Sequence, residues 1–177
     1  VQRYGLIYAG AQKNLGPSGL TVVIARRDLV DRCASDVSPL LSYATYQREH
    51  SLYNTPNTFA ILVLAEVLAW VQEQGGVTAM HARAQARAAR LYDAIDHSRG
   101  FVGHAAANSR SLMNITFRGR TPAHEQALIA ACEADHLLGL RGHRSVGGLR
   151  ASMYNAFPDH GVDRLIAQLR AVDQQLA

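Results

Sequence analysis

The stretch Gly10-Ala11-Gln12-Lys13-Asn14-Leu15-Gly16-Pro17-Ser18-Gly19 holds three glycines and one proline in ten residues. A segment so rich in turn-forming residues predicts a tight loop. Two short apolar runs, 4–9 and 20–25, flank the loop and are rich in β-branched or aromatic residues. Both runs are predicted to be buried strands. The sequence therefore places Lys13 in a loop that joins two strands.

Lys13 is the only lysine, since the other 17 of the 18 basic residues counted as Lys or Arg are arginines. A lysine amine can lose its proton and attack a carbonyl carbon, whereas a guanidinium cannot. A lone lysine in a glycine-bearing loop after a strand is therefore a candidate Schiff-base residue. The alternative is a surface lysine in an arginine-rich chain, and composition leaves both interpretations open.

A second group of chemically active residues lies in the stretch Gly142-His143-Arg144-Ser145-Val146-Gly147-Gly148-Leu149-Arg150-Ala151-Ser152. Glycines let the backbone approach a ligand closely, and guanidinium groups bind carboxylate or phosphate through paired hydrogen bonds. One interpretation is a site for a small molecule with two anionic groups. The other is a basic surface loop, and the residues alone favour neither.

A third stretch, Asn54-Thr55-Pro56-Asn57-Thr58, precedes a predicted helix. Its amides and hydroxyls are good N-cap groups. The same groups suit a phosphate, which the amides at a helix start also favour. Sequence alone does not separate these two roles.

The order of the predicted elements is mixed α/β. After the two strands, we expect a long loop over 34–56, a buried helix over 58–74, a helix over 77–96, a strand over 111–118, a helix over 123–134, strands over 138–141 and 149–153, and a closing helix that starts near Pro158. The second helix is expected to bury Val77, Met80, Ala84, Ala88, Leu91 and Ile95 and to expose Arg83, Arg87 and Arg90. The closing helix is expected to bury Val162, Leu165, Ile166, Leu169 and Val172.

Composition excludes several classes of protein. The 177 residues are 48% hydrophobic and carry a formal net charge of +4, with no basic run or aromatic interleaving of the kind that binds nucleic acid. The most apolar stretch, 59–71, contains Glu66 and is shorter than the ~20 residues that span a bilayer. The histidines and the two cysteines match no metal or redox spacing. We therefore expect a cytoplasmic protein without metal, nucleic-acid or membrane partners.

Taken together, the three stretches resemble the phosphoserine aminotransferase family. Tyr53-Asn54-Thr55-Pro56, Gly75-Gly76-Val77, Met113-Asn114-Ile115-Thr116-Phe117 and Tyr154-Asn155-Ala156 follow the family's pattern in order and spacing, with the lysine stretch and the 142–152 stretch. The resemblance covers the carboxy-terminal half of the family's pattern. It implies an α/β PLP-dependent transferase of fold type I, with residues 1–75 ending the large PLP-binding domain and residues 76–177 forming the small carboxy-terminal domain.

The resemblance also implies a function and a site. The family transfers an amino group from glutamate to 3-phosphohydroxypyruvate, giving phosphoserine and 2-oxoglutarate, in serine and in many bacteria pyridoxine biosynthesis. It does so as a homodimer that shares its pyridoxal 5'-phosphate sites across the interface. By this resemblance Lys13 is the catalytic Schiff-base residue, Gln12 lies near the cofactor phosphate, and Asn54 and Thr55 reach the partner's cofactor phosphate. His143 and Arg144 match residues at the substrate phosphate, and Arg150 matches the arginine that holds the substrate carboxylate.

The main departure from the family is the absence of an amino-terminal half. That half supplies the aromatic ring stacked on the cofactor and the aspartate paired with the pyridine nitrogen, and the chain opens at Val1 as if inside a fold. We therefore expect a fragment that is inactive alone. Two alternatives are another fold type I PLP aminotransferase, such as an alanine–glyoxylate aminotransferase, and a catalytically silent anion-binding or dimerisation fragment. The pair His143 and Arg144 counts against the first.

Overall fold

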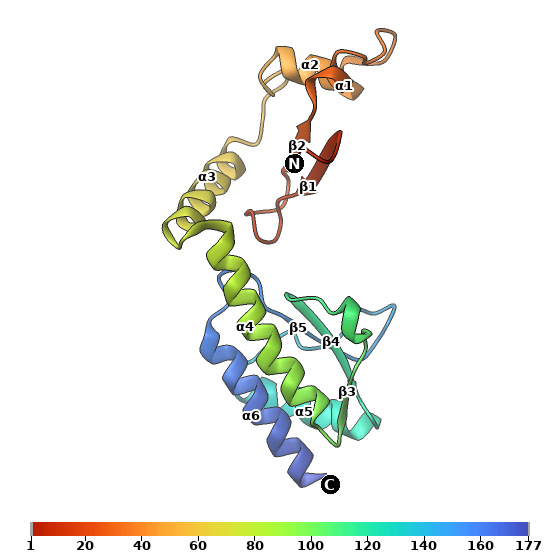
Figure 1. Ribbon diagram of the computed structural model, residues 1–177, viewed down its shortest axis with the longest axis vertical. Coiled ribbons are helices and arrows are strands. Elements are labelled where there is room, and N and C mark those ends of the chain that lie inside the picture. Colours follow the sequence, from red (N-terminus) through yellow and green to blue (C-terminus); the bar gives the residue numbers. More distant parts are fainter. Residues whose placement is uncertain (1, 177) are drawn as a thin grey trace. The chain divides into compact units, whose positions relative to one another are not determined.

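The computed structural model describes residues 2–176. The chain divides into two compact units, the first ending at Glu73 and the second beginning at Gln74. The division lies beside the double glycine Gly75-Gly76. Each unit has its own sheet, and each is described here by itself (Figure 1).

Unit 1 opens with an antiparallel hairpin of β1 (Leu6–Gly10) and β2 (Thr21–Ala25). The register runs from Leu6 opposite Ala25 to Gly10 opposite Thr21. The amide N–H of Ala11 donates to the carbonyl of Leu20 over 3.0 Å and closes the loop between the strands. Both strands lie where the apolar runs predicted them.

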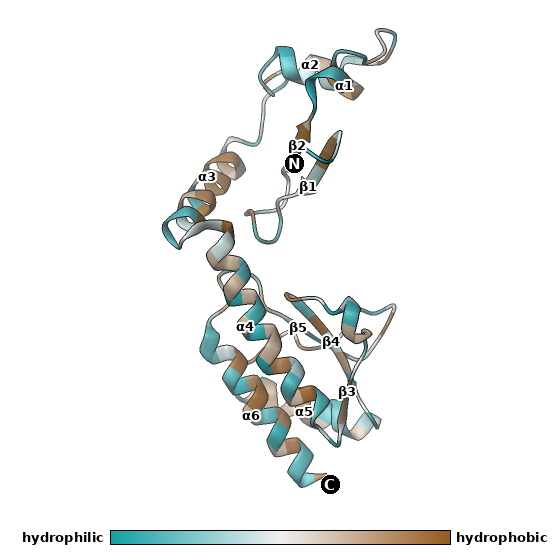
Figure 2. Ribbon diagram, in the orientation of Figure 1, coloured by the Kyte–Doolittle hydropathy of each residue, from teal (hydrophilic) through white to brown (hydrophobic). Residues whose placement is uncertain are grey.

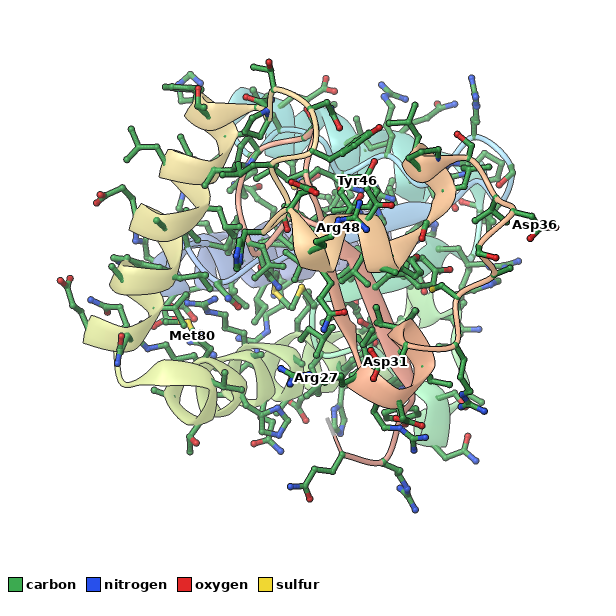
Figure 3. All side chains as sticks on the ribbon, turned by 90° about the horizontal axis from the view of Figure 1, so that it is seen from above. Arg27, Asp31, Asp36, Tyr46, Arg48 and Met80 are labelled. Atoms are coloured by element: carbon green, nitrogen blue, oxygen red, sulfur yellow. The ribbon has the colours of Figure 1, made fainter. Side chains whose placement is uncertain are left out.

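Short helices occupy much of the segment that follows the hairpin: α1 (Arg27–Val30), η1 (Pro39–Leu41) and α2 (Tyr43–Arg48). The prediction of a loop over 34–56 was therefore wrong for η1 and α2, because elements of three to six residues are too short to show a helical period. Local bonds hold them, such as the 3.3 Å bond from the Tyr46 hydroxyl to the Leu40 carbonyl. Figure 3 shows Tyr46 and Arg48 on α2, and Arg27 at the start of α1.

The helix α3 (Thr58–Glu73) ends unit 1 and has the predicted span, but it is not buried. Figure 2 shows hydrophobic residues around almost the whole helix. Ala60 alone of its residues is buried, while Phe59 is 72% exposed and Leu62 58% exposed. The hairpin is likewise open, with Tyr8 74% exposed. The prediction of burial was wrong because, within residues 2–73, no second layer covers these apolar surfaces.

Unit 2 begins with α4 (Gly76–Asp96) and a three-stranded antiparallel sheet in the order β3 (Phe101–Gly103), β4 (Asn114–Gly119), β5 (Leu149–Ser152). Between strands come η2 (Ala107–Ser109) and α5 (Pro122–Ala134), and α6 (Asp159–Gln175) closes the chain. The three helices α4, α5 and α6 pack on one face of the sheet, which leaves the other face open (Figure 1).

The core of unit 2 lies between that helical layer and the sheet. From the sheet come alternate residues, Phe101, Ile115, Phe117, Leu149 and Ala151, as the period of two requires. Phe101 and Phe117 meet edge to face, with ring centroids 6.1 Å apart. All five predicted residues of the closing helix are buried. Burial also raises the pKa of the Cys132 thiol to about 11.

Three details of unit 2 differ from the sequence-based expectations. Strand β3 was not predicted, because three residues carry no alternation to detect. The expected strand over 138–141 is reduced to an isolated bridge between Arg141 and Leu149. On α4, Val77 is 80% exposed, whereas Arg87, expected in solvent, is only 5% exposed.

Arg87 is buried because it lies on the same stripe as the apolar residues, seven positions after Met80 and four before Leu91. Its guanidinium finds acceptors there, the carboxylate of Asp159 and the carbonyls of Tyr154 and Asn155. Hydrogen bonding to several acceptors makes the burial of its charge tolerable.

Candidate functional site

The lysine loop, residues 10–19, depends on glycine at two turns. Gly16 and Gly19 have φ values of 148° and 97°, a region that residues with a side chain rarely adopt. The N–H of Lys13 donates to the carbonyl of Ala11 over 2.6 Å, and the Lys13 residue is exposed. The backbone turn therefore presents the only primary side-chain amine of the chain at the surface of unit 1.

The lysine loop lies against the first half of α3. A Cβ atom added to Gly19 would lie 3.3 Å from Nδ2 of Asn57, and one added to Gly16 would lie 3.6 Å from Cα of Leu64. Asn54 and Thr55 immediately precede this helix. Unit 1 thus brings the lysine loop and the first half of α3 to the same region.

The residue that caps α3 is Asn57, rather than Asn54 or Thr55, the predicted cofactor ligands. Its Oδ1 accepts a 3.1 Å hydrogen bond from the N–H of Ala60. Asn54 and Thr55 are exposed, and their side chains make no hydrogen bond within residues 2–176. The helix-capping role considered for this segment is therefore filled by a third residue, which leaves the donors of Asn54 and Thr55 available for a ligand.

In unit 2, the open face of the sheet carries a row of polar residues across its three strands. Thr116 is the register partner of Arg150 on β5, and its carbonyl accepts a 3.0 Å bond from the N–H of His104 just beyond β3. Residues paired across antiparallel strands project from the same face. Because Ile115 and Phe117 on β4 point into the core, this row points to the open side.

A cavity of about 220 Å³ lies over this face and is called the basic pocket here. Its lining consists of His104, Thr116, Phe117, Arg118, Gly142, His143, Val146, Gly147, Gly148, Leu149 and Arg150. Two arginines and two histidines line it, and none of the lining residues is acidic. Such a cavity attracts anions, and arginine is suited to bind carboxylate or phosphate through two hydrogen bonds.

The turn 142–148 forms one wall of the basic pocket. Gly148 has a φ of 66°, and a Cβ atom there would lie 2.8 Å from the carbonyl oxygen of Phe117, so only glycine fits. The Nδ1 atom of His143 lies 3.3 Å from the N–H of Ser145, from which it accepts a hydrogen bond. This bond favours the tautomer with its proton on Nε2, which can donate to an anion.

Arg150 and Arg144 have different surroundings. The Nε atom of Arg150 is buried and lacks a hydrogen-bond partner within residues 2–176. A buried charged donor is costly unless an acceptor reaches it, so the position suits a ligand-binding residue. Arg144 is exposed and does not line the basic pocket. The structure therefore brings His143 and Arg150 together but leaves Arg144 outside the lining.

Sequence reasoning missed two residues of the basic pocket, His104 and Arg118. In the sequence, His104 is one of the histidines that match no metal spacing, and Arg118 is the last residue of the strand expected over 111–118. A signal was present for Arg118, since it alternates with the apolar residues Ile115 and Phe117 and so belongs to the open face. No such signal existed for His104, because its position depends on the pairing of a three-residue strand.

Within residues 2–176, no three His, Cys, Asp or Glu side chains gather as a metal site would require. In the same range, no single helix has the length and apolar character to cross a membrane; the bent pair α3 and α4 meets these criteria by length and composition only.

The chain was compared with known proteins. The profile of the aminotransferase class-V family matches residues 1–165. A phosphoserine aminotransferase of Lysinibacillus sphaericus (strain C3-41) is 55% identical over 159 residues, which are 89% of this chain and 44% of that protein. The chain therefore spans about half the length of the curated relatives it matches.

Solved structures show the same likeness. The phosphoserine aminotransferase from Bacillus circulans subsp. alkalophilus matches with a TM-score of 0.95 and 45% identity, over 99% of this chain and 49% of that one. A PLP-bound phosphoserine aminotransferase from Trichomonas vaginalis matches with a TM-score of 0.88 and 36% identity, over 96% of this chain and 48% of that one. The TM-scores of 0.95 and 0.88 show that the backbone of this chain follows nearly the same path as the matching half of each enzyme.

Proposed function

This chain belongs to the aminotransferase class-V family and has its PLP-dependent transferase fold, and on that premise we propose that its protein is a phosphoserine aminotransferase. The proposed reaction transfers an amino group between glutamate and 3-phosphohydroxypyruvate and gives phosphoserine and 2-oxoglutarate. The observation that carries the proposal is the basic pocket, with two arginines, two histidines and no acidic lining residue. Both amino-acid substrates of the reaction carry two anionic groups, which such a pocket would recognise.

The residues of unit 1 fit one end of pyridoxal phosphate. Lys13 supplies a surface amine from a glycine-shaped loop, and Gln12, Asn54 and Thr55 supply neutral donors for a phosphate. We assign no residue of this chain to stack on the pyridine ring or to pair with its nitrogen. The chain thus has the groups to hold the aldehyde and the phosphate of the cofactor, and the other contacts must come from elsewhere.

Each of these residues has a distinct task in the proposed reaction. Bound pyridoxal phosphate supplies a ring that withdraws electrons from the substrate α-carbon. Nζ of Lys13 would hold the aldehyde carbon and, as a free amine, would take the proton from the substrate α-carbon as a general base. The guanidinium of Arg150 would hold the substrate carboxylate, and His143 and Arg144 the substrate phosphate.

A rival within the same fold is an alanine–glyoxylate aminotransferase. Its substrates are small and carry a single carboxylate, for which one arginine is enough. The basic pocket holds His104, Arg118 and His143 in addition to Arg150. The second guanidinium, that of Arg118, and the N–H groups of the two imidazoles favour a substrate with a second anionic group.

The proposal includes a homodimer, in which Asn54 and Thr55 serve the cofactor of the partner subunit, and a cytoplasmic location. The homodimer is supported by the side chains of Asn54 and Thr55, which are exposed and make no hydrogen bond within residues 2–176. The cytoplasmic location stays a prediction from the sequence.

A chimera tests the function directly. The chain replaces the matching half of the Bacillus circulans enzyme, whose structure it resembles over 49% of that chain. We expect the chimera to transaminate 3-phosphohydroxypyruvate with glutamate at a rate near that of the parent enzyme, and the chain alone to be inactive. A chimera that binds pyridoxal phosphate and uses glyoxylate but not 3-phosphohydroxypyruvate would reject the proposed substrate.

A further inference from the structure

The pair Arg118 and His104 lies in the basic pocket but is assigned no task by the resemblance. We propose that Arg118 is an additional phosphate-binding, specificity-determining residue, and that His104 is the positioning residue that orients it. This inference rests on the proposed function, which supplies phosphoserine as the ligand.

The two side chains are in direct contact on the open face of the sheet. One terminal nitrogen of the Arg118 guanidinium, Nη2, lies 2.6 Å from Nδ1 of His104. His104 stands in the row of Thr116 and Arg150, and Arg118 stands two residues further along β4. Diagonal neighbours in adjacent strands are within reach of long side chains, so this contact follows from the register.

Within residues 2–176, Arg118 has no carboxylate partner that would neutralise its charge. None of the ion pairs within residues 2–176 includes it, whereas Arg87, Arg90, Arg110 and Arg164 of the same unit each bind an aspartate. A guanidinium has five N–H donors, and the contact with His104 uses one of them. The remaining donors are available to an anion in the basic pocket.

The position of Arg118 associates it with the phosphate end of the substrate. The turn that carries His143 passes directly over β4 at this point, because a Cβ atom added to Gly148 would lie 3.5 Å from Cβ of Arg118. A phosphate monoester carries up to two negative charges and three strong acceptor oxygens, more than a carboxylate. An extra cation beside His143 therefore adds most to the binding of a phosphorylated substrate.

His104 acts through Arg118 by accepting its hydrogen bond. An imidazole that accepts at Nδ1 is neutral and carries its proton on Nε2. The bond fixes one edge of the guanidinium and restricts the rotamers of a long, exposed side chain, which lowers the entropy lost when a ligand binds. An asparagine has an acceptor, Oδ1, at nearly the same distance from the backbone as Nδ1, so it should replace His104 in this task.

Calorimetric titration of the 177-residue chain with O-phospho-L-serine, inorganic phosphate and L-serine tests the inference without catalysis. We expect Arg118→Gln to weaken the binding of O-phosphoserine by about tenfold, the typical worth of one charge-assisted contact. L-Serine should be unaffected. His104→Ala should weaken O-phosphoserine binding less, His104→Asn should restore it, and His104→Ala should have no further effect in the Arg118→Gln background.

The matched control is Arg170→Gln, which removes the same charge from an exposed position on α6, in the helical layer. It should leave all three affinities unchanged. The inference is overturned if the wild-type chain binds neither phosphate ligand at millimolar concentration, if Arg118→Gln changes O-phosphoserine affinity less than twofold, or if it weakens L-serine equally. Failure of the chimera to transaminate, with the phosphate affinities as expected, would reject the proposed function alone.

Discussion

Nε of Arg87 on α4 lies 2.6 Å from Oδ1 of Asp159 at the start of α6, and the pair joins residues 72 positions apart. The arginine side chain is 6% exposed and the aspartate side chain 65%. The same guanidinium bonds the carbonyls of Tyr154 and Asn155, in the segment that leaves β5. Arg87 thus ties the strand that carries Arg150 to the helical layer behind it.

Replacing Arg87 by alanine should destabilise unit 2 by about 2–3 kcal/mol. This loss is smaller than the usual loss for breaking a fully buried ion pair, because the Asp159 carboxylate is largely exposed to water. The comparison variant is Arg90→Ala, one turn along the same helix, whose 2.6 Å pair with Asp163 is exposed on both sides. That variant should cost less than about 1 kcal/mol. Urea unfolding of both variants measures the difference, and equal losses would contradict a special role for Arg87.

The pair also predicts a pH dependence. The hydrogen bond from Arg87 lowers the pKa of Asp159 below its ordinary value. A carboxyl whose pKa is lower in the folded state stabilises the protein above its unfolded pKa, about 3.9, and this contribution is lost as the pH falls through the folded value. The stability difference between the wild type and Asp159→Asn should therefore be constant above about pH 5 and shrink below pH 4. A stability difference that grows as the pH falls would mean that folding raises the pKa of Asp159 instead of lowering it.

Lys13 is predicted to bind pyridoxal phosphate covalently. Borohydride reduction of the chimera should attach the reduced cofactor to the peptide that contains Lys13, with the added mass found by mass spectrometry. Lys13→Arg keeps the positive charge but should abolish both the attachment and the transamination, because a guanidinium does not attack a carbonyl. Attachment to another lysine of the chimera would exclude the assignment.

Arg144 and Arg150 should bind opposite ends of the substrate. In the chimera, Arg150→Gln should lower kcat/KM for every amino acid by roughly ten- to a hundredfold, since all carry the α-carboxylate. Arg144→Gln should penalise phosphoserine much more than an analogue without phosphate. The ratio of kcat/KM for the paired substrates is the measurement. Equal losses for both in Arg144→Gln would remove Arg144 from the phosphate site.

Asn54 and Thr55 are predicted to serve the partner subunit. Mixed dimers of a chimera carrying Asn54→Ala and Thr55→Ala with one carrying Lys13→Ala should contain one intact site of the two. Activity should therefore reappear on mixing two inactive parents, and subunit exchange can be verified by native mass spectrometry. Mixed dimers that form but stay inactive would place both residues at the site of their own subunit.

Hydrophobic periodicity predicted burial correctly where the surface that covers the apolar residues belongs to unit 2 itself. The closing helix is the clearest case, since Val162, Leu165, Ile166, Leu169 and Val172 form a continuous stripe, and all five are buried. The same reasoning failed for α3, whose apolar residues the described chain leaves exposed. A pattern of hydrophobic residues predicts that a surface prefers to be covered, but it does not say whether the cover is part of the same chain.

The proximity of His143 and Arg150 was predictable because one short stretch holds both residues. His143 and Arg150 occur seven residues apart around a glycine turn, and the structure places both in the basic pocket. His104 and Arg118 depend instead on how two strands pair across a connection of ten residues between β3 and β4. No local spacing encodes that register, so only the three-dimensional arrangement shows the pair.

The burial of Cys132 has a practical consequence for spectroscopy. A thiol with a pKa of about 11 and no exposed surface does not react with maleimides near neutral pH, whereas Cys33 is only half-buried. Cys33 lies in unit 1, so a thiol-directed fluorophore can be attached there without engineering. The emission of that fluorophore would report changes around the segment after α1, while unit 2 stays unlabelled.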